Sequence, residues 1–270
     1  MTILSTADLT SGYGKEVIST KLNTSFEKGS ITSIIGPNGC GKSTLLKTLA
    51  RILPQLDGHV LLESKELNAY SSKEIARKLA ILSQTPDSMV DLSVFDLVSF
   101  GRHPYQKGWK SLSSEDQQYI QWALELTGLT ERARESVAIL SGGQRQRVWI
   151  AMALVQDTEV LLLDEPTTYL DPAHQLEILN VLRMINEQQK KTIVMTLHDI
   201  NLASRFSDRI IAMKQGQVIK EGTPAEVITA ETLKQVFSIE AEIVCHGETK
   251  RPLILSYEMT SEEHRHELES

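Results

Sequence analysis

The chain has 270 residues, of which 41% are hydrophobic and 23% are charged. This composition is ordinary for a globular protein and allows one large domain with a subdomain. The net charge of −7 argues against a nucleic-acid binder, which usually carries a basic excess, and gives no support for docking on bare anionic lipid. No apolar run approaches the roughly 18 residues of a membrane helix, so we expect no membrane span.

The first third of the chain indicates short strands followed by one strand–turn–helix unit. Residues 3–19 and 22–30 are typical of antiparallel strands with glycine turns, and residues 31–36 of a buried strand. Apolar side chains then recur at helical spacing, which predicts a helix that ends before Pro54; they are Leu45, Leu46, Leu49, Ile52 and Leu53. Residues 59–64 and 78–84 indicate further strands, and residues 71–74 form a capping box that opens a short helix.

The pattern changes over residues 86–156, where strands give way to helices near 94–100, 115–127 and 142–156. Strands and helices alternate again from residue 159 to residue 222, and residues 223–226 form a second capping box. Such alternation predicts a parallel, doubly wound α/β sheet. We therefore expect one domain over 1–245, with a core of about 1–85 and 157–240 around a helical subdomain of about 86–156. Residues 246–270 would form a β appendage followed by a polar tail. We expect the tail to be disordered.

Residues 36–43 fit the phosphate-binding pattern G-x-x-x-x-G-K-[ST]. A glycine turn before a helix is the alternative, but the preceding strand and following helix favour a nucleotide site. Glycines let backbone N–H groups turn toward a phosphate, and the helix adds its positive end. Lys42 would reach the β- and γ-phosphates, and Ser43 would bind Mg²⁺. The predicted cradle consists of Gly36, Pro37, Asn38, Gly39, Cys40, Gly41, Lys42, Ser43 and Thr44.

Two adjacent acids follow the apolar run of residues 160–163. At the carboxyl end of a buried parallel strand, Asp164 and Glu165 would lie where open α/β sheets bind ligands. Two buried carboxylates need compensating charge, which favours Asp164 as an Mg²⁺ ligand and Glu165 as the base that orients or deprotonates water. The alternative is a surface turn with two solvated acids.

Two further polar residues are expected at strand ends on the same edge of the sheet. His198 follows a buried strand and is a candidate γ-phosphate contact, although a lone histidine is usually structural. Gln84 is either a turn residue or a neutral ligand to Mg²⁺ and water.

A second glycine pair occurs in the segment LSGGQRQR, residues 140–147. Ser141, Gly142, Gly143 and Gln144 match a capping box, but this does not explain two glycines in the first turn of a helix. Glycine is favoured where backbone must approach a ligand closely, so this helix start is a second candidate anion site. It would cap the γ-phosphate from the side opposite Lys42, either within one chain or from a partner chain.

Together these motifs resemble the ATP-binding cassette (ABC) ATPases. The resemblance implies an α/β P-loop NTPase fold with a parallel core sheet, an N-terminal antiparallel β subdomain and an inserted helical subdomain. It implies a head-to-tail dimer in which Ser141 and Gly143 contact the γ-phosphate of the neighbour's ATP. It also implies that Tyr13 stacks on adenine, although Tyr13 could equally be a turn aromatic, and that Asp171 faces the partner. Asp171 also reads as an N-cap before Pro172.

Longer segments, including GRHPYQKGW and DEPTTYLDPAHQLEIL, are similar to ATPase subunits of iron–siderophore importers, a group close to those for cobalamin and haem. This similarity implies ATP hydrolysis with Mg²⁺ at the cytoplasmic face of the membrane. It implies membrane permease partners, an indirect partnership with an extracytoplasmic substrate-binding protein, and no nucleic acid. A cobalamin or haem importer, or an ABC ATPase without a transport role such as one serving iron–sulfur assembly, remains an alternative.

Overall fold

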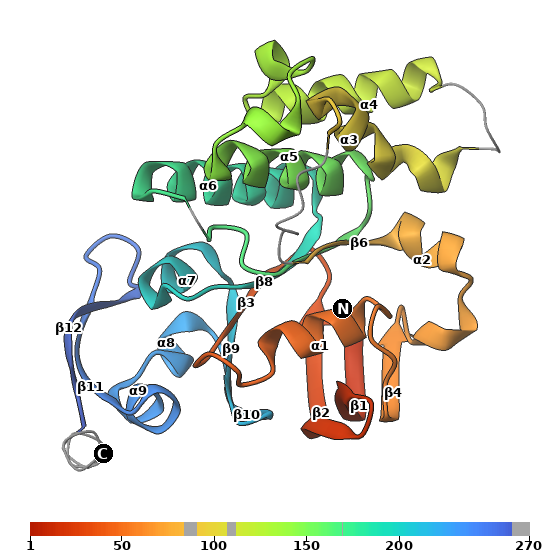
Figure 1. Ribbon diagram of the computed structural model, residues 1–270. Coiled ribbons are helices and arrows are strands. Elements are labelled where there is room, and N and C mark those ends of the chain that lie inside the picture. Colours follow the sequence, from red (N-terminus) through yellow and green to blue (C-terminus); the bar gives the residue numbers. More distant parts are fainter. Residues whose placement is uncertain (84–90, 107–111, 169, 261–270) are drawn as a thin grey trace.

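A computed structural model describes residues 1–83, 91–106, 112–168 and 170–260. Figure 1 shows a layer of helices above the main sheet, a second sheet on the opposite side, and a hairpin near the C-terminus. The described strands form a six-stranded sheet, a four-stranded sheet and a two-stranded sheet. Residues 261–270, where we expect a disordered tail, lie outside the described residues.

The six-stranded sheet positions the candidate site. Its strands, in spatial order, are β10 (Gln217–Gly222), β9 (Arg209–Lys214), β3 (Ile31–Ile35), β8 (Thr192–Thr196), β7 (Val160–Leu163) and β6 (Leu79–Leu82). All neighbours pair in parallel except β10, which joins β9 as an antiparallel edge strand. The predicted parallel α/β sheet is thus confirmed, and β3, β8 and β7 are adjacent strands.

Each central strand is buried throughout because both faces of the sheet are covered. Successive strand residues alternate between two hydrophobic clusters, so that Ile34 and Val194 face one layer whereas Ile35 and Met195 face the other. The first layer contains the predicted antiparallel sheet and two helices: β1 (Thr2–Tyr13), β2 (Glu16–Glu27), β4 (Asp57–Leu62), β5 (Lys65–Glu66), α1 (Lys42–Leu49) and α2 (Ser72–Lys78). The short 3₁₀ helix η1 (Leu67–Ala69) precedes α2.

The other layer is helical (Figure 1). Its elements are α3 (Val94–Ser99), α4 (Ser114–Leu126), α5 (Gly142–Val155), α6 (Pro172–Gln189), α7 (Ile200–Phe206), α8 (Pro224–Val227) and α9 (Ala230–Phe237), with 3₁₀ turns η2 (Phe100–Tyr105), η3 (Thr130–Arg132) and η4 (Val137–Ile139). The three helices expected between residues 86 and 156 match α3, α4 and α5 within a residue at each end. The capping boxes predicted at Ser71 and Thr223 are present. The division into core and helical subdomain stays a prediction.

The first helix ends before Pro54 as predicted, but the prediction that it includes Ile52 and Leu53 is wrong. Helix α1 ends at Leu49, Arg51 adopts a left-handed φ of 57°, and Ile52 is 56% exposed. A residue close before proline is disfavoured in helical conformation, and the turn at Arg51 leads the chain toward β4. The N–H groups of Ile52 and Leu53 both donate to the carbonyl of Lys47. The apolar spacing continues by chance beyond the point where the backbone turns.

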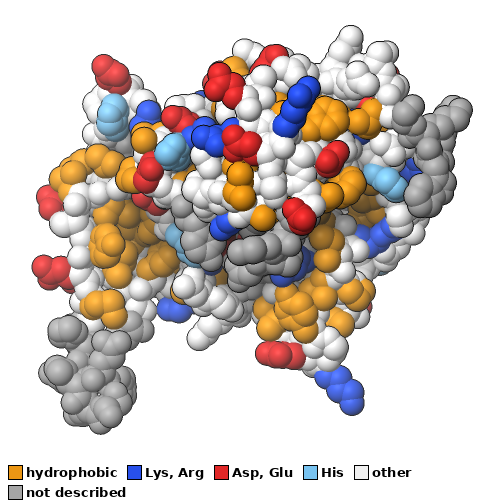
Figure 2. Space-filling view, turned by 45° about the horizontal axis from the view of Figure 1, so that its top comes forward, with side chains coloured by type: hydrophobic (Ala, Val, Ile, Leu, Met, Phe, Trp, Pro, Cys, Tyr) orange, Lys and Arg blue, Asp and Glu red, His pale blue; other side chains and the backbone are white. Residues whose placement is uncertain are grey.

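The C-terminal hairpin, β11 (Ile239–Cys245) with β12 (Pro252–Met259), packs on α7 and α9. Figure 2 shows hydrophobic side chains gathered over this hairpin and a second hydrophobic group at the lower right of the same face, whereas acidic and basic side chains are interspersed over the helices. Leu255 and Tyr257 are the most exposed apolar residues of β12. In the described part of the chain, no helix has the length and apolar character needed to span a bilayer.

Candidate functional site

The ends of β3, β7 and β8 surround a cavity of about 470 Å³. It is lined by Ile18, Asn38, Gly39, Gly41, Lys42, Ser43, Thr44, Glu165 and His198. Because parallel strands end at the same edge of a sheet, residues far apart in sequence meet here. The cavity therefore brings together the predicted phosphate loop, the predicted base and the predicted histidine.

The loop after β3 has a backbone that only glycine accommodates well. Gly36 and Gly41 have φ values of 154° and 102°, in the left-handed region that disfavours side chains. A Cβ on Gly36 would lie 2.2 Å from the carbonyl oxygen of Met213. Around Gly39, by contrast, the position of a Cβ is open, with no described atom within 4 Å. The loop leads directly into the N-terminus of α1, whose first N–H groups and helix dipole suit an anion.

Lys42 supplies positive charge within this loop. Its side chain is buried, and Nζ donates to the carbonyl oxygens of Gly36 at 2.8 Å and Pro37 at 2.9 Å. These dipoles orient the ammonium group without cancelling its charge, so a phosphate beside it would be stabilised. Cys40 is buried in the same loop, and burial raises the pKa of its thiol. The thiol is therefore a packed neutral group at pH 7.

The carboxylate of Asp164 joins the three strand ends. Asp164 is 2% exposed, and its Oδ1 accepts hydrogen bonds from Ser43 Oγ and Thr196 Oγ1, each at 2.9 Å. Its Oδ2 is buried and has no hydrogen-bond partner among the described residues. A buried, unsatisfied carboxylate oxygen is costly, whereas Mg²⁺ favours such an oxygen together with a hydroxyl. The donor set around Asp164 thus fits the expected metal ion.

Glu165 lies beside Asp164 but faces the cavity. Its φ is 53°, and its N–H donates to Thr196 Oγ1 at 2.7 Å. His198 Nε2 lies 2.8 Å from Oε1, and Thr168 Oγ1 donates to Oε2 at 2.9 Å. Burial raises the pKa of the Glu165 carboxyl, but the hydrogen bonds from His198 and Thr168 lower it by more, so the pKa lies below its ordinary value. Glu165 is therefore an ionised carboxylate at neutral pH.

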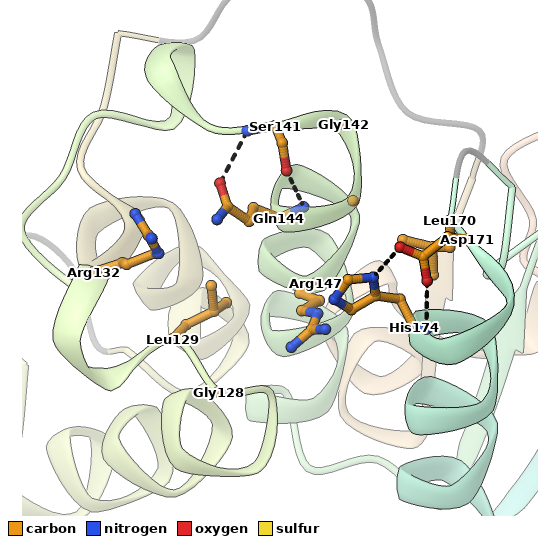
Figure 3. Close-up of a pocket in the computed structure, with 11 residues that line it drawn as sticks. Gly128, Leu129, Arg132, Ser141, Gly142, Gln144, Arg147, Leu170, Asp171 and His174 are labelled. Carbon is orange, nitrogen blue, oxygen red and sulfur yellow. Dashed lines mark hydrogen bonds and ion pairs between the residues drawn. The ribbon is translucent and has the colours of Figure 1, made fainter.

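A second cavity, of about 440 Å³, lies at the start of α5 (Figure 3). It is lined by Gly128, Leu129, Arg132, Ser141, Gly142, Gly143, Gln144, Arg147, Leu170, Asp171 and His174. None of these residues lines the first cavity. Within one chain, the two glycine-rich helix starts therefore belong to separate sites.

The capping box predicted at Ser141 is present. Ser141 Oγ accepts from the N–H of Gln144 at 3.3 Å, and the Gln144 side chain accepts from the N–H of Ser141 at 3.0 Å. Gly142 and Gly143 have ordinary negative φ angles, so their conformation does not require glycine. A Cβ on Gly143 would approach only the flexible end of Leu170, at 2.9 Å. These glycines leave the helix start uncovered.

Asp171 lines the same second cavity and begins α6. Its carboxylate accepts from the N–H of His174 at 3.0 Å and lies 2.7 Å from His174 Nδ1. Figure 3 shows both contacts, with the His174 ring facing Arg147. The predicted N-cap is confirmed.

Tyr13 is 46% exposed at the end of β1 and is not one of the residues that line the first cavity; Ile18 of β2 lines it instead. Gln84 lies outside the described residues, so its role stays a prediction. The sequence reasoning missed Thr168 and Thr196, which bond Glu165 and Asp164. The position of Thr196 at the end of a predicted strand was a sequence signal for its role. No sequence signal pointed to Thr168.

Comparisons with known proteins agree with this geometry. Residues 19–168 match the family described as ABC transporter. The chain is 55% identical to the iron(3+)-hydroxamate import ATP-binding protein FhuC of Bacillus subtilis (strain 168), over 97% of this chain and 98% of that protein.

Two solved structures are similar. One belongs to an inward-facing ABC transporter assigned to the metal-chelate type, with a TM-score of 0.80 and 29% identity over 94% of this chain and 96% of that chain. The other is a dimeric post-hydrolysis state of the ATP-binding cassette MJ0796 bound to ADP and Pi. It has a TM-score of 0.71 and 30% identity over 82% of this chain and 98% of that chain.

The contact of Thr168 with Glu165 predicts a pH effect. In Thr168→Val one hydrogen bond to the ionised carboxylate is lost, so the pKa of Glu165 rises and the carboxylate protonates at a higher pH. We expect the acid limb of the pH–rate profile of ATP hydrolysis to move to higher pH, with turnover at neutral pH largely retained. Thr249→Val, in the C-terminal hairpin turn, is the control. An unshifted acid limb would show that ionisation of Glu165 does not govern turnover.

Proposed function

The chain belongs to the ABC transporter family, and on this premise we propose that it hydrolyses ATP to energise the import of iron–siderophore complexes through a separate membrane permease. The observation that carries the enzymatic part is the meeting of the phosphate loop, Asp164, Glu165 and His198 at one edge of the sheet. The assignment of the cargo is based on the relative that is 55% identical to this chain over nearly its whole length. The name of that relative specifies iron(3+)-hydroxamate import.

We assign the phosphates of ATP to the loop of residues 36–44, with Lys42 beside the β- and γ-phosphates. Ser43 and Asp164 would hold Mg²⁺, with Gln84 as a further oxygen ligand. The metal would neutralise part of the phosphate charge. Asp164 Oδ2, which has no hydrogen-bond partner in the described part of the chain, supports this assignment, because the metal would satisfy it.

Glu165 would act as the base for the attacking water. Its carboxylate is ionised and lines the phosphate cavity, so it can accept a hydrogen bond from water and orient the water toward the γ-phosphate. Nε2 of His198 lies 2.8 Å from Oε1 of Glu165, and the His198 side chain is 46% exposed. This exposure would allow the histidine to contact the γ-phosphate as well. Tyr13 would stack on adenine from the end of β1.

The second cavity would serve the nucleotide of another copy. Ser141, Gly142, Gly143 and Gln144 form an uncovered helix start that lies in a different cavity from Lys42. A head-to-tail pair would place this start against the partner's γ-phosphate, with Asp171 at the interface. The negative φ angles of both glycines support this, since close approach of a ligand then explains why glycine occurs there. The dimeric state of the MJ0796 cassette is a precedent.

Coupling to transport would require a permease. We propose that the chain acts at the cytoplasmic face of the membrane and that the region of α3 to α5 transmits nucleotide-driven movement to the permease. An extracytoplasmic substrate-binding protein would deliver the iron complex. The similarity to a chain of the metal-chelate type transporter supports this arrangement.

Uptake measurements test the cargo. Cells that lack this chain should fail to accumulate iron supplied as a labelled ferric hydroxamate, and the intact gene should restore uptake, whereas uptake of labelled cobalamin should not change. Loss of cobalamin uptake with normal iron uptake would refute the assignment.

Replacing the proposed base tests the enzymatic assignment. Glu165→Gln should lower ATP turnover by about 10²–10⁴-fold, the usual contribution of a positioned base. It should also accumulate ATP-bound dimers, measurable by gel filtration with Mg·ATP. Glu159→Gln, which alters an exposed ion pair with Lys28, is the control and should behave like the parent. Parent-like turnover in Glu165→Gln would contradict the role of Glu165.

Mixed dimers test whether each site is shared between copies. Lys42→Ala and Gly143→Ala should each be poorly active alone, because every site in either homodimer carries the defect. A mixed dimer contains one site with both changes and one intact site, so mixing the two proteins should restore the trapping of labelled ATP between the subunits at the intact site. Absence of recovery, with dimer formation verified, would argue that each chain holds a complete site.

A further inference from the structure

A buried glutamine on α5 is bonded to the segment that follows Glu165. Gln146, on α5 one turn after Ser141–Gly143, is 4% exposed, and its Nε2 donates to the carbonyl oxygen of Pro166 at 3.1 Å. Pro166 directly follows Glu165 in the chain. The bond therefore runs from the helix that begins at the second cavity to the backbone beside the proposed base of the first.

A second contact holds the same segment to the same helix. Leu170 is buried, and the end of its side chain lies beside Gly143, 2.9 Å from the position that a Cβ would take. The Leu170 carbonyl also accepts from Gln175 Nε2 at 3.0 Å, which fixes it to α6. The backbone after Glu165 is thus anchored to the start of α5 at Pro166 and again at Leu170.

The conformation of Glu165 depends on such anchors. A non-glycine residue with a φ of 53° is strained, and such a conformation persists when surrounding contacts determine it. Thr196 holds the Glu165 N–H on one side, and Gln146 holds the next carbonyl on the other. Since the ring of Pro166 fixes φ between these two bonds, a displacement of its carbonyl shifts the backbone from which the Glu165 side chain extends.

We propose that Gln146 is a positioning residue that sets the orientation of Glu165 according to how the Ser141–Gly143 turn is seated on the nucleotide of a second copy. When the turn closes on the partner's phosphate, α5 carries Pro166 with it and aligns the carboxylate of Glu165 with its own nucleotide. This inference rests on the proposed function and adds to it the link by which occupancy of one site governs hydrolysis at the other.

The substitution Gln146→Met tests the proposal, because methionine keeps nearly the same volume but cannot donate to Pro166. We expect kcat for ATP hydrolysis by the full-length chain to fall on the order of 10-fold or more, since small displacements of a reacting group have such effects. The KM for ATP and the affinity for a fluorescent ATP analogue should change by less than about two-fold, because the phosphate loop is untouched. Gln146→Glu should show the same pattern.

Gln156→Met is the matched control. Gln156 caps the other end of α5 and donates from Nε2 to the carbonyls of Ala76 and Leu79, so its replacement removes the same type of bond far from both cavities. It should lower the thermal unfolding midpoint as much as Gln146→Met does, yet retain parental kcat. Equal kcat values in the two variants would overturn the proposal. A change of KM in Gln146→Met with an unchanged kcat would overturn it as well. A parent chain that does not hydrolyse ATP overturns the proposed function itself.

Discussion

The carboxylate of Asp164 is the interaction on which the site depends. A buried carboxylate is stable only when it is paired or hydrogen-bonded. Here Ser43 from the phosphate loop and Thr196 from β8 both donate to Oδ1. These bonds fix the ends of three adjacent strands relative to one another. Because Thr196 also accepts from the N–H of Glu165, the same arrangement sets the proposed base beside the proposed metal ligand.

Neighbouring carboxylates acquire different properties from different surroundings. Asp164 is enclosed and keeps one oxygen without a partner among the described residues, which suits a metal ion. Glu165 faces the cavity, where His198 and Thr168 lower the pKa of its carboxyl and keep it charged. One acid can therefore hold a cation while the next contacts water.

The separation of the two cavities has a structural consequence. The phosphate loop and the Ser141–Gly143 turn lie in different cavities of one chain, but the short segment after Glu165 contacts both. Buried contacts at Pro166 and Leu170 transmit displacement because packed interiors deform little. Communication between sites would thus require no long pathway through the molecule.

Local spacing and strand ends were enough to predict the parallel sheet, the phosphate loop, the acids after β7 and the capping boxes at Ser71 and Ser141 from the sequence. It misplaced the end of α1, because apolar spacing does not report a left-handed turn such as that at Arg51. Only the tertiary structure decided that Thr168 and Thr196 orient the acids, that Ile18 lines the cavity, and that Gln146 reaches Pro166. These contacts join residues on different elements, and polar side chains at single positions leave no periodic signal.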